Sequence, residues 1–502
     1  MRSRCVLWLK RLALVLAVLA LCVQPACAAK NVILMVSDGA GFNTWIATSM
    51  YQGRLFMQVY DAPGWVRLGC STYPLNQSTK PKGSDAQDPA LVYDAAKAWA
   101  TALRPDTTIK GDSDAADADA EPAPAPAGQI FAGYVYLKAT YTDSAAAATS
   151  MAGGVKTYNN AINWSDRNQS LRGRTIAEIA KSAGKSVGVV TTVPWSHATP
   201  AALGGAHNVT RNDYVGIAQE MLNAPYLDVI MGAGHPDFND DGAPRTKKQE
   251  YKYVGGAATW RQLTAGTHPA GWKLVETKAD FEALTTGATT GKVLGTAQVA
   301  TTLQQRRRKA AEKPFSCPFN RNVPTLATMT KGAIHCLEKN PKGFYLMIEG
   351  GAVDWANHAG QSDRMIEEQI DFVKAIEAVV NWVEHNSSWD DTLLILTADH
   401  ETGLIWGPDS DKVPFDPLVD RGAGNVPGMR YNATRHTNSL VPLLARGPGS
   451  ERFAALAVAT DKTAAAKYGI SGQYVDNIAI FTVMKAAVIA PRAVKRVPAL
   501  SR

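Results

Sequence analysis

The sequence predicts an α/β protein in three layers, with a central, largely parallel sheet flanked by helices. Two patterns support this prediction: short apolar runs that stop abruptly at polar or glycine-rich residues, and helical patterns between those runs. Uninterrupted runs rich in Val, Ile and Leu are typical of strands buried on both faces, as in parallel sheets. Strands that alternate with helices give a layered α/β fold.

Six apolar runs are predicted strands. They are 31–36 before SDGAG, 186–193 before PWSHATP, 228–231 before GAGHP, 344–348 before EGGAVDWANH, 392–397 before ADHETG, and 441–445 before RGPG. Helical patterns lie between them, for example at 175–183 and 364–384. Ligands of such sheets bind beyond the carboxyl ends of the strands. The Asp, Glu and His residues gathered at these ends are therefore the first candidates for a functional site.

The N-terminus resembles a secretory signal peptide over residues 1–28. A basic leader precedes a short apolar run and the small-residue motif ACA, which predicts cleavage after Ala28 and a periplasmic or secreted protein. Lipidation of Cys27 is the alternative, although Gln24 suits it poorly. The apolar run is too short to cross a bilayer as a helix, and no later segment is a convincing membrane span. We expect one domain over 29–490 and a basic tail over 491–502.

Charge gives little reason to expect a nucleic-acid partner. Without the four basic residues of the leader, 48 Lys and Arg stand against 45 Asp and Glu, and four of those 48 lie in the C-terminal tail. The basic character of the chain therefore comes from its two ends. The basic run 306–309 is expected to be a solvated helix face rather than a binding patch.

Two features affect stability rather than chemistry. Residues at about 76–128 form a low-complexity insertion rich in Pro, Asp, Ala and Ser, which buries too little apolar surface to order itself fully. A surface helix over 90–103 is expected within it. After signal removal three cysteines remain, and the short loop between Cys317 and Cys336 favours a disulfide there in an oxidising compartment. Cys70 would then be a buried thiol.

The segment TDSAAAATSMAGG, residues 142–154, predicts a helix that begins at Ser144. Its small side chains allow close approach, and a helix N-terminus offers N–H groups and a positive dipole end to an anion. A serine at this position can also do no more than cap the helix.

Acidic and histidine residues at the other strand ends suggest a metal cluster. They are Asp38, Glu349, Asp354, His358, Asp399, His400 and His436. Asp354 and His358 are four residues apart and share one face if a helix begins there. Imidazole and carboxylate ligands suit zinc, while carboxylate and hydroxyl oxygens suit magnesium. Any one of these residues could instead be a surface charge, a cap or a core histidine.

The order of these motifs resembles the alkaline phosphatase family. The motifs are NVILMVSDGAG, TDSAAAATSMAGG, HATPAA, IEGGAVDWANHAG, LTADHETG and RHTN, and the resemblance runs from about residue 30 to YVDNIAIFTVMKAA. It implies a metal-dependent phosphomonoesterase that forms a phosphoserine intermediate and releases inorganic phosphate from small phosphorylated substrates. It also implies two Zn²⁺ and one Mg²⁺ per subunit and a homodimer.

The resemblance also assigns roles. Asp354, His358 and His436 would bind the first zinc. Asp38, Asp399 and His400 would bind the second, with Ser144 as the nucleophile. Asp38, Thr199 and Glu349 would hold the third metal. Arg211 would clamp phosphate and Asp143 would orient it, although one extra residue separates Arg211 from HATP.

Two positions depart from the pattern of some family members. His197 stands where the best-known bacterial members have an aspartate near the third metal, although other members do have histidine, and Trp355 stands where some members have a phosphate-directed lysine. An imidazole in place of a carboxylate removes one negative charge from the third site. We therefore expect magnesium to bind there more weakly, or another divalent ion to replace it, unless His197 only hydrogen-bonds a neighbour.

Rival functions are a sulfatase, a phosphodiesterase of the same superfamily, and an exported protein that binds metal or phosphate without catalysis. A sulfatase needs a modified Cys or Ser in a C/S-x-P-x-R context, whereas Ser144 is followed by AAAATS. Phosphodiesterases of the superfamily generally use threonine and lack the third site, so Thr199 with Glu349 argues against them. A binding protein would be expected to have lost its nucleophile or a ligand, and none is lost.

Overall fold

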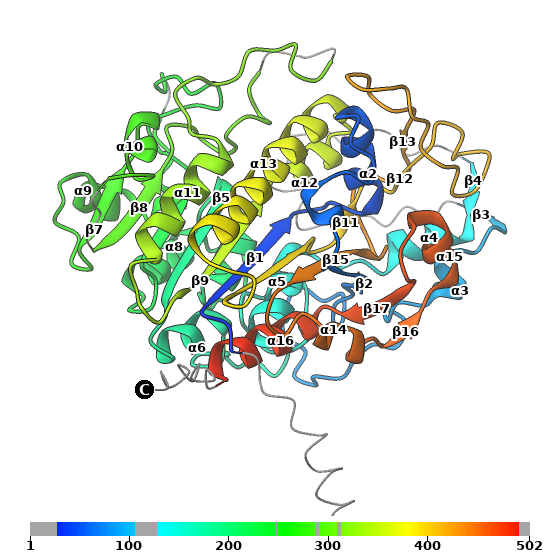
Figure 1. The fold of residues 1–502 in the computed structure, drawn as a ribbon, viewed down its shortest axis with the longest axis horizontal. Helices are drawn as coiled ribbons and strands as arrows, with labels where there is room; N and C mark the ends of the chain where they lie inside the picture. The colour runs from blue at the N-terminus through cyan, green and yellow to red at the C-terminus, as the bar shows by residue number, and fades with distance from the viewer. Residues whose placement is uncertain (1–27, 106–127, 247, 288–290, 309–312, 491–502) are drawn as a thin grey trace, which may run out of the picture.

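The computed structural model describes residues 28–105, 128–246, 248–287, 291–308 and 313–490, and it is built on one eleven-stranded sheet (Figure 1). From edge to edge the strands are β16 (Ala459–Thr460), β17 (Gln473–Asp476), β2 (Val66–Ser71), β15 (Val441–Arg446), β10 (Thr392–Thr397), β1 (Asn31–Ser37), β9 (Phe344–Gly350), β5 (Ser186–Pro194), β6 (Val229–Ala233), β8 (Lys292–Thr296) and β7 (Trp272–Val275). Seven strands at one side of the sheet are all parallel to one another: β10, β1, β9, β5, β6, β8 and β7. Antiparallel pairs join β10 to β15, β15 to β2, and β16 to β17.

All six predicted strands are confirmed, as β1, β5, β6, β9, β10 and β15. The reason is visible in β1, whose seven residues are all buried because sheet neighbours flank it and helices cover both faces. A strand in this setting needs apolar side chains in both directions, which explains the uninterrupted run NVILMV.

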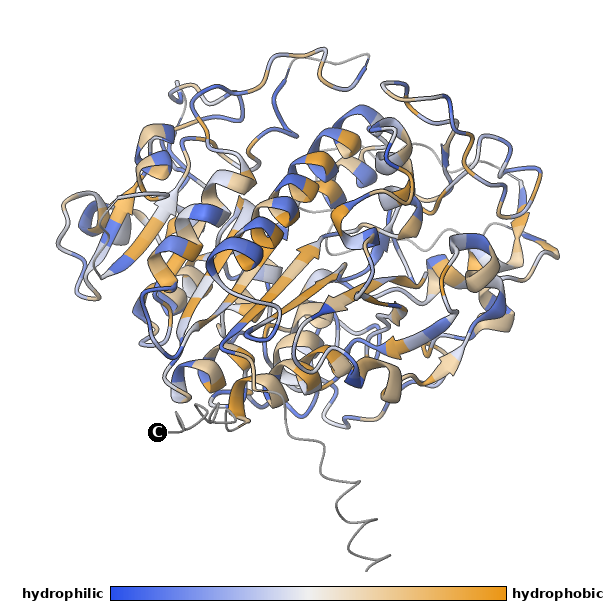
Figure 2. Ribbon diagram, in the orientation of Figure 1, coloured by the Kyte–Doolittle hydropathy of each residue, from blue (hydrophilic) through white to orange (hydrophobic). Residues whose placement is uncertain are grey.

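Helices form the two outer layers, which confirms the predicted three-layer architecture. One face of the central strands is covered by α11 (Leu326–Leu337) and α13 (Ser362–Asn386), and the other by α5 (Ser144–Gly153), α6 (Ile176–Ser182), α7 (Ala198–Leu203) and α16 (Ile478–Ile489). The predicted helices at 175–183 and 364–384 correspond to α6 and α13. Figure 2 shows hydrophobic strands between helices that are hydrophilic on their outer sides.

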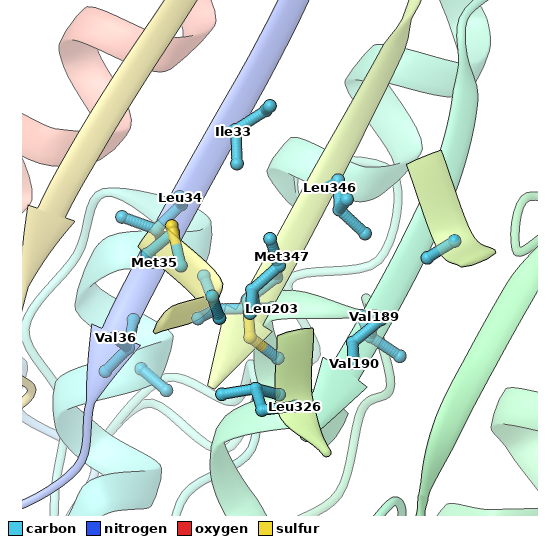
Figure 3. Close-up of a cluster of buried hydrophobic side chains, with 14 of the residues drawn as sticks. Ile33, Leu34, Met35, Val36, Val189, Val190, Leu203, Leu326, Leu346 and Met347 are labelled. Carbon is cyan, nitrogen blue, oxygen red and sulfur yellow. The ribbon is translucent and has the colours of Figure 1, made fainter. Parts of the chain in front are cut away.

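The core lies on both faces of the sheet. Figure 3 shows side chains of β1, β5 and β9 packed with Leu203 of α7 and Leu326 of α11. These residues are fully buried and belong to one continuous cluster. Because the core fixes the central strands, it also fixes the edge where their carboxyl ends meet.

Further elements surround this framework. The helices are α2 (Phe42–Tyr51), α3 (Ala95–Ala98), α4 (Ala132–Ala139), α8 (Tyr214–Asn223), α9 (Ala257–Thr264), α10 (Lys278–Ala283), α12 (Ala352–His358), α14 (Arg452–Ala455) and α15 (Lys462–Tyr468). Short strand pairs are β3 (Leu103–Pro105) with β4 (Gln129–Phe131), β11 (Glu401–Thr402) with β14 (His436–Thr437), and β12 (Ile405–Trp406) with β13 (Arg430–Tyr431). Within the described ranges, no helix combines the length and apolar composition needed to cross a membrane.

The insertion is attached to the main fold at its described ends. Backbone N–H groups of Lys82 and Ser84 donate to the Asp166 carboxylate at 3.0 and 3.1 Å, and β3 pairs with β4. The surface helix expected over 90–103 is shorter than predicted, because only α3 forms, capped by Asp94. Residues 106–127, the predicted signal peptide up to residue 27, and the tail over 491–502 lie outside the described residues. The division into domains stays a prediction.

Two sequence expectations are wrong. No disulfide joins Cys317 to Cys336. Cys317 lies in a loop where its carbonyl oxygen accepts a hydrogen bond from Arg307, whereas Cys336 belongs to α11. Cys70 is a buried thiol, as expected. The described part of the basic run 306–309 is not helical, and Arg307 is buried against Glu367 of α13. A short loop in sequence does not bring two sulfur atoms together, and a charged residue can be buried when a partner neutralises it.

Helix α13 also contains a buried carboxyl group, that of Glu368, which makes the free energy of unfolding depend on pH. Burial first, and then the nearby Asp371 and Glu367, raise the pKa of Glu368 to about 8. An unfolded glutamate titrates near 4.3, so between about pH 4.3 and 8 the folded state binds more protons than the unfolded state. The free energy of unfolding therefore falls as pH rises through this window.

Glu368→Gln is expected to stabilise the protein by about 1–3 kcal/mol at pH 8 and by much less at pH 5. Denaturant unfolding at both pH values, in constant zinc, measures the difference. Glu384→Gln, an exposed position on the same helix, is the control and should change little at either pH. A Glu368→Gln effect that is the same at pH 5 and pH 8 would contradict the raised pKa.

Candidate active site

The carboxyl ends of β1, β9 and β10 bring two clusters of candidate metal ligands together. In the first, Asp354 and His358 project from α12, which follows β9, and His436 comes from β14. The His358 and His436 Nε2 atoms are 3.0 Å apart, and each lies 3.3–3.6 Å from an Asp354 carboxylate oxygen. These are the three residues that the resemblance groups at one zinc.

The backbone orients both imidazoles of this cluster. His358 Nδ1 lies 2.7 Å from the carbonyl oxygen of Thr434, and His436 Nδ1 lies 2.9 Å from that of Thr142. A carbonyl only accepts, so each Nδ1 must hold the hydrogen, and a neutral ring then directs its Nε2 lone pair into the cluster. Metal-binding histidines are commonly oriented by such contacts.

The second cluster is Asp38, Asp399 and His400. Asp38 follows β1, and the other two follow β10. His400 Nε2 lies 3.3 Å from Asp399 Oδ2, 3.6 Å from Asp38 Oδ1 and 3.1 Å from Ser144 Oγ. The His400 ring stacks on the His436 ring of the first cluster with centroids 3.6 Å apart. The two clusters are therefore neighbours.

The chemistry of these residues fits cations. Asp38 Oδ1 and Asp399 Oδ2 are buried oxygens without a hydrogen-bond donor. Burial and then the charge of Asp399 raise the pKa of Asp38, and burial followed by the charge of Asp354 raises the pKa of Asp399 to about 6. Burying a carboxylate that accepts no hydrogen bond costs free energy. A divalent cation bound between these oxygens would offset their repulsion and take the place of the missing hydrogen-bond donors.

Ser144 is the first residue of α5 and is almost fully buried. Asp143, not Ser144, caps the helix: its Oδ1 accepts from the Ala146 N–H at 2.9 Å. Asp143 Oδ2 accepts from the Asn160 N–H at 2.9 Å and from Arg211 Nη1 at 3.2 Å. The capping carboxylate thus holds the Arg211 guanidinium beside the start of α5. The extra residue before Arg211 does not prevent this approach.

The three residues assigned to the third metal also lie close together. Glu349 is the penultimate residue of β9, where it is the register partner of Val36 of β1 and of Thr191 of β5. Burial raises the pKa of Glu349 to about 8, although hydrogen bonds from Thr191 and Thr199 act in the opposite direction. The charge of Glu349 in turn helps to raise the pKa of Asp38. Glu349 Oε1 is a further buried oxygen without a donor in the hydrogen-bond geometry.

His197 and Trp355 lie beside this group. His197 precedes α7, and its Nε2 lies 3.4 Å from the Tyr214 hydroxyl. Its ring stacks on Tyr214 with centroids 5.6 Å apart and lies 5.5 Å from the Trp355 ring. His197 thus has the neighbouring hydrogen-bond partner that the sequence analysis allowed.

Several supporting residues were not predicted. The Thr402 hydroxyl donates to Asp354 Oδ1 at 2.5 Å and lies 3.3 Å from His400 Nδ1, so it links the two clusters. Thr191 hydrogen-bonds Glu349. Thr402 could have been suspected only from its closeness in sequence to His400, two residues before it.

Gly39 is needed where α12 meets the end of β1. It has a positive φ of 68°, and a Cβ atom there would lie 2.6 Å from Asp354 Oδ1. Its N–H donates to Asp399 Oδ1 at 3.2 Å. The glycine in SDGAG therefore permits the two clusters to approach one another.

This fold and site define a class: three-layer α/β proteins with paired carboxylate–histidine clusters beside a serine at a helix N-terminus. The chain belongs to the alkaline phosphatase family, because the family model "Alkaline phosphatase" matches residues 133–415.

Individual relatives agree. The chain is 31% identical over 356 residues to alkaline phosphatase of Escherichia coli K12, covering 64% of this chain and 72% of the relative. It is 33% identical over 267 residues to alkaline phosphatase 3 of Bacillus subtilis, covering 52% and 49%. The chain thus spans about half the length of this Bacillus relative. The solved alkaline phosphatase of the Antarctic bacterium TAB5 shares the fold, with a TM-score of 0.56, 23% identity, and coverage of 92% and 98%. A variant of the TAB5 enzyme has been solved with Mg bound in its M3 site.

Proposed function

We propose that this protein is a metal-dependent phosphomonoesterase in which Ser144 attacks phosphorus and forms a phosphoserine intermediate. One observation supports this most directly: the Ser144 hydroxyl lies at the N-terminus of α5, 3.1 Å from His400 Nε2 and beside both clusters. The phosphoryl group would pass from the leaving oxygen to Ser144 Oγ. Water would then cleave the new O–P bond, releasing inorganic phosphate and restoring the serine.

The two clusters would hold two Zn²⁺, with Asp354, His358 and His436 around one and Asp38, Asp399 and His400 around the other. When bound, such metals lower the pKa of a coordinated hydroxyl or water and neutralise charge on the entering and leaving oxygens. Asp38, Thr199 and Glu349 would hold a third metal. Carboxylate and hydroxyl donors favour Mg²⁺, and Mg is bound in the M3 site of a TAB5 variant in which a histidine is replaced by glutamate. His197 supplies no carboxylate, so we keep the expectation of weaker binding there.

The chain itself would position and stabilise the phosphoryl group. The N-terminus of α5 provides backbone N–H groups and a positive dipole end beside Ser144. The planar guanidinium of Arg211 can pair with two phosphoryl oxygens, and Asp143 fixes its orientation. Ser144, Asp143 and Arg211 are all at least 95% buried. Such burial excludes bulk water and strengthens each of these electrostatic contacts.

Hydrolysis of p-nitrophenyl phosphate beside bis(p-nitrophenyl) phosphate by the zinc-loaded protein, at mildly alkaline pH, tests the proposal. We expect the monoester to be hydrolysed at least about a hundredfold faster, because only a dianionic phosphoryl group meets the full set of cations and donors. Faster turnover of the diester would indicate a phosphodiesterase. Bound zinc without turnover of either ester would indicate a binding protein.

Two further features belong to the proposal. Export to the periplasm or the medium follows from the predicted signal peptide, with small phosphorylated compounds rather than nucleic acids as substrates. The homodimer implied by the resemblance stays a prediction.

A further inference from the structure

A tight turn at residues 158–161 lies between α5 and α6. The N–H of Ala161 donates to the carbonyl oxygen of Tyr158 at 3.4 Å, and Asn160, the third residue of the turn, has a positive φ of 77°. A type II turn requires φ near +80° at this position. Glycine adopts such a φ without strain, asparagine adopts it more readily than most residues, and β-branched residues rarely adopt it. The conformation of the turn therefore depends on which residue stands at position 160.

The backbone of Asn160 contacts both residues of the proposed phosphate clamp. Its N–H donates to Asp143 Oδ2 at 2.9 Å, and the same oxygen accepts from Arg211 Nη1 at 3.2 Å. The carbonyl oxygen of Asn160 accepts from the Arg211 N–H at 2.8 Å. Asn160, Asp143 and Arg211 thus form a closed ring of three hydrogen bonds. A change in the backbone at position 160 would therefore move Arg211 and the carboxylate that orients it.

The turn is attached to the structure on both sides. The Thr149 hydroxyl of α5 donates to the carbonyl oxygen of Ala161 at 2.8 Å. Ile162 and Asn208 exchange two backbone hydrogen bonds, at 3.0 and 2.8 Å. The turn thus joins the helix that begins at Ser144 to the segment that leads to Arg211.

The Asn160 side chain does not hold this arrangement together. The residue is 4% exposed, and its Oδ1 is buried without a hydrogen-bond partner among the described residues. The hydrogen bonds of the ring come from the Asn160 backbone instead. What position 160 supplies is therefore a left-handed backbone conformation rather than a carboxamide contact.

We propose that Asn160 is a positioning residue, whose left-handed backbone conformation fixes the Arg211 guanidinium in the orientation that binds the phosphoryl group. This rests on the proposed phosphomonoesterase activity. A displaced guanidinium would weaken the binding of phosphate monoesters and of inorganic phosphate alike, because both offer the same oxygens to its paired N–H donors. Since Asn160 acts through Arg211, its effect should disappear when the guanidinium is removed.

The first test introduces a β-branched residue that disfavours the positive φ. Asn160→Val is expected to lower kcat/KM for p-nitrophenyl phosphate about tenfold, mainly through KM. The Kd of the zinc-loaded variant for inorganic phosphate, measured by calorimetry, should rise by a similar factor. Asn160→Gly keeps the conformation without the carboxamide and should stay within about twofold of the wild type in both constants. Asn168→Val is the matched control: Asn168 has a φ of 60° in an exposed turn, and its substitution should change neither constant more than about twofold.

The second test repeats Asn160→Val in an Arg211→Ala background. If Asn160 acts through the guanidinium, kcat/KM should fall less than about twofold in this background, whereas the thermal midpoint should fall equally in both backgrounds. If Asn160→Val does not fold, Asn160→Ala takes its place, with an expected loss of about fivefold that is again absent in Arg211→Ala. The proposal is overturned by a loss that is the same in both backgrounds, by no loss in either, or by an equal loss in Asn160→Gly, which would assign the effect to the carboxamide.

Failure of the proposed activity would give a different result. If the wild-type protein does not hydrolyse p-nitrophenyl phosphate, the phosphomonoesterase is refuted, and the Kd values for inorganic phosphate then decide the role of Asn160. An unchanged Kd in Asn160→Val rejects that role, as does a wild-type protein that binds no phosphate. A raised Kd in Asn160→Val, with the wild-type value in Asn160→Gly, supports it without turnover.

Discussion

Ser144→Ala should lower kcat for phosphate monoesters by at least about a thousandfold while the protein stays folded, because no other hydroxyl can replace the attacking oxygen at the start of α5. The substitution removes the contact of Ser144 Oγ with His400 Nε2. Its cost to the free energy of unfolding should be about 1 kcal/mol, the value of one hydrogen bond. Steady-state kinetics and thermal unfolding of the zinc-loaded variant measure the two effects.

Ser150→Ala is the matched control. Ser150 belongs to the same helix, is equally buried, and donates to the Ala146 carbonyl oxygen at 3.0 Å. We expect it to retain activity within about threefold, since it loses only a local hydrogen bond. If Ser144→Ala kept a tenth or more of the wild-type kcat, Ser144 would not be the nucleophile. Similar losses in both variants would indicate a structural effect on α5.

Removal of metal should abolish activity and lower the thermal midpoint together. Without cations, Asp38 Oδ1 and Asp399 Oδ2 are buried without a hydrogen-bond partner, and the charge of Asp399 disfavours the ionised form of Asp38. Two sites, each saturated at about a thousandfold above Kd, would together contribute about 8 kcal/mol, a loss on the order of 10 °C in Tm. Dialysis against a chelator, followed by metal analysis, kinetics and calorimetry, measures these changes, and added Zn²⁺ should reverse them.

Substitution of a single ligand should reproduce part of this effect. His436→Ala is expected to reduce the bound zinc by about one ion per chain, because the first cluster then keeps only Asp354 and His358. His385→Ala, near the C-terminus of α13 and bonded to the Asn381 carbonyl, should leave the zinc content unchanged. A chelated protein that contains no metal yet retains its activity and Tm would refute the metal-dependent mechanism.

Much of the fold was predictable because strand burial is a local property of the sequence. A strand covered on both faces, such as β1, requires an uninterrupted apolar run, and this requirement is visible without any knowledge of its neighbours. The helix starting at Ser144 was predictable for a similar reason, since small residues and a capping side chain act within one turn. The grouping of ligands came from the family resemblance, not from periodicity.

The sequence by itself determined the layered α/β architecture and the strand ends where polar residues gather, whereas the grouping of these residues into a candidate site came from the family resemblance. The tertiary structure alone decided how individual side chains are used. Arg307 is buried against Glu367, and Arg306 lies over the Trp355 ring. Cys317 and Cys336 do not form a disulfide, and Thr402 hydrogen-bonds between the two clusters. These outcomes depend on pairs of residues far apart along the chain, whose approach is fixed by packing of the whole core rather than by local pattern.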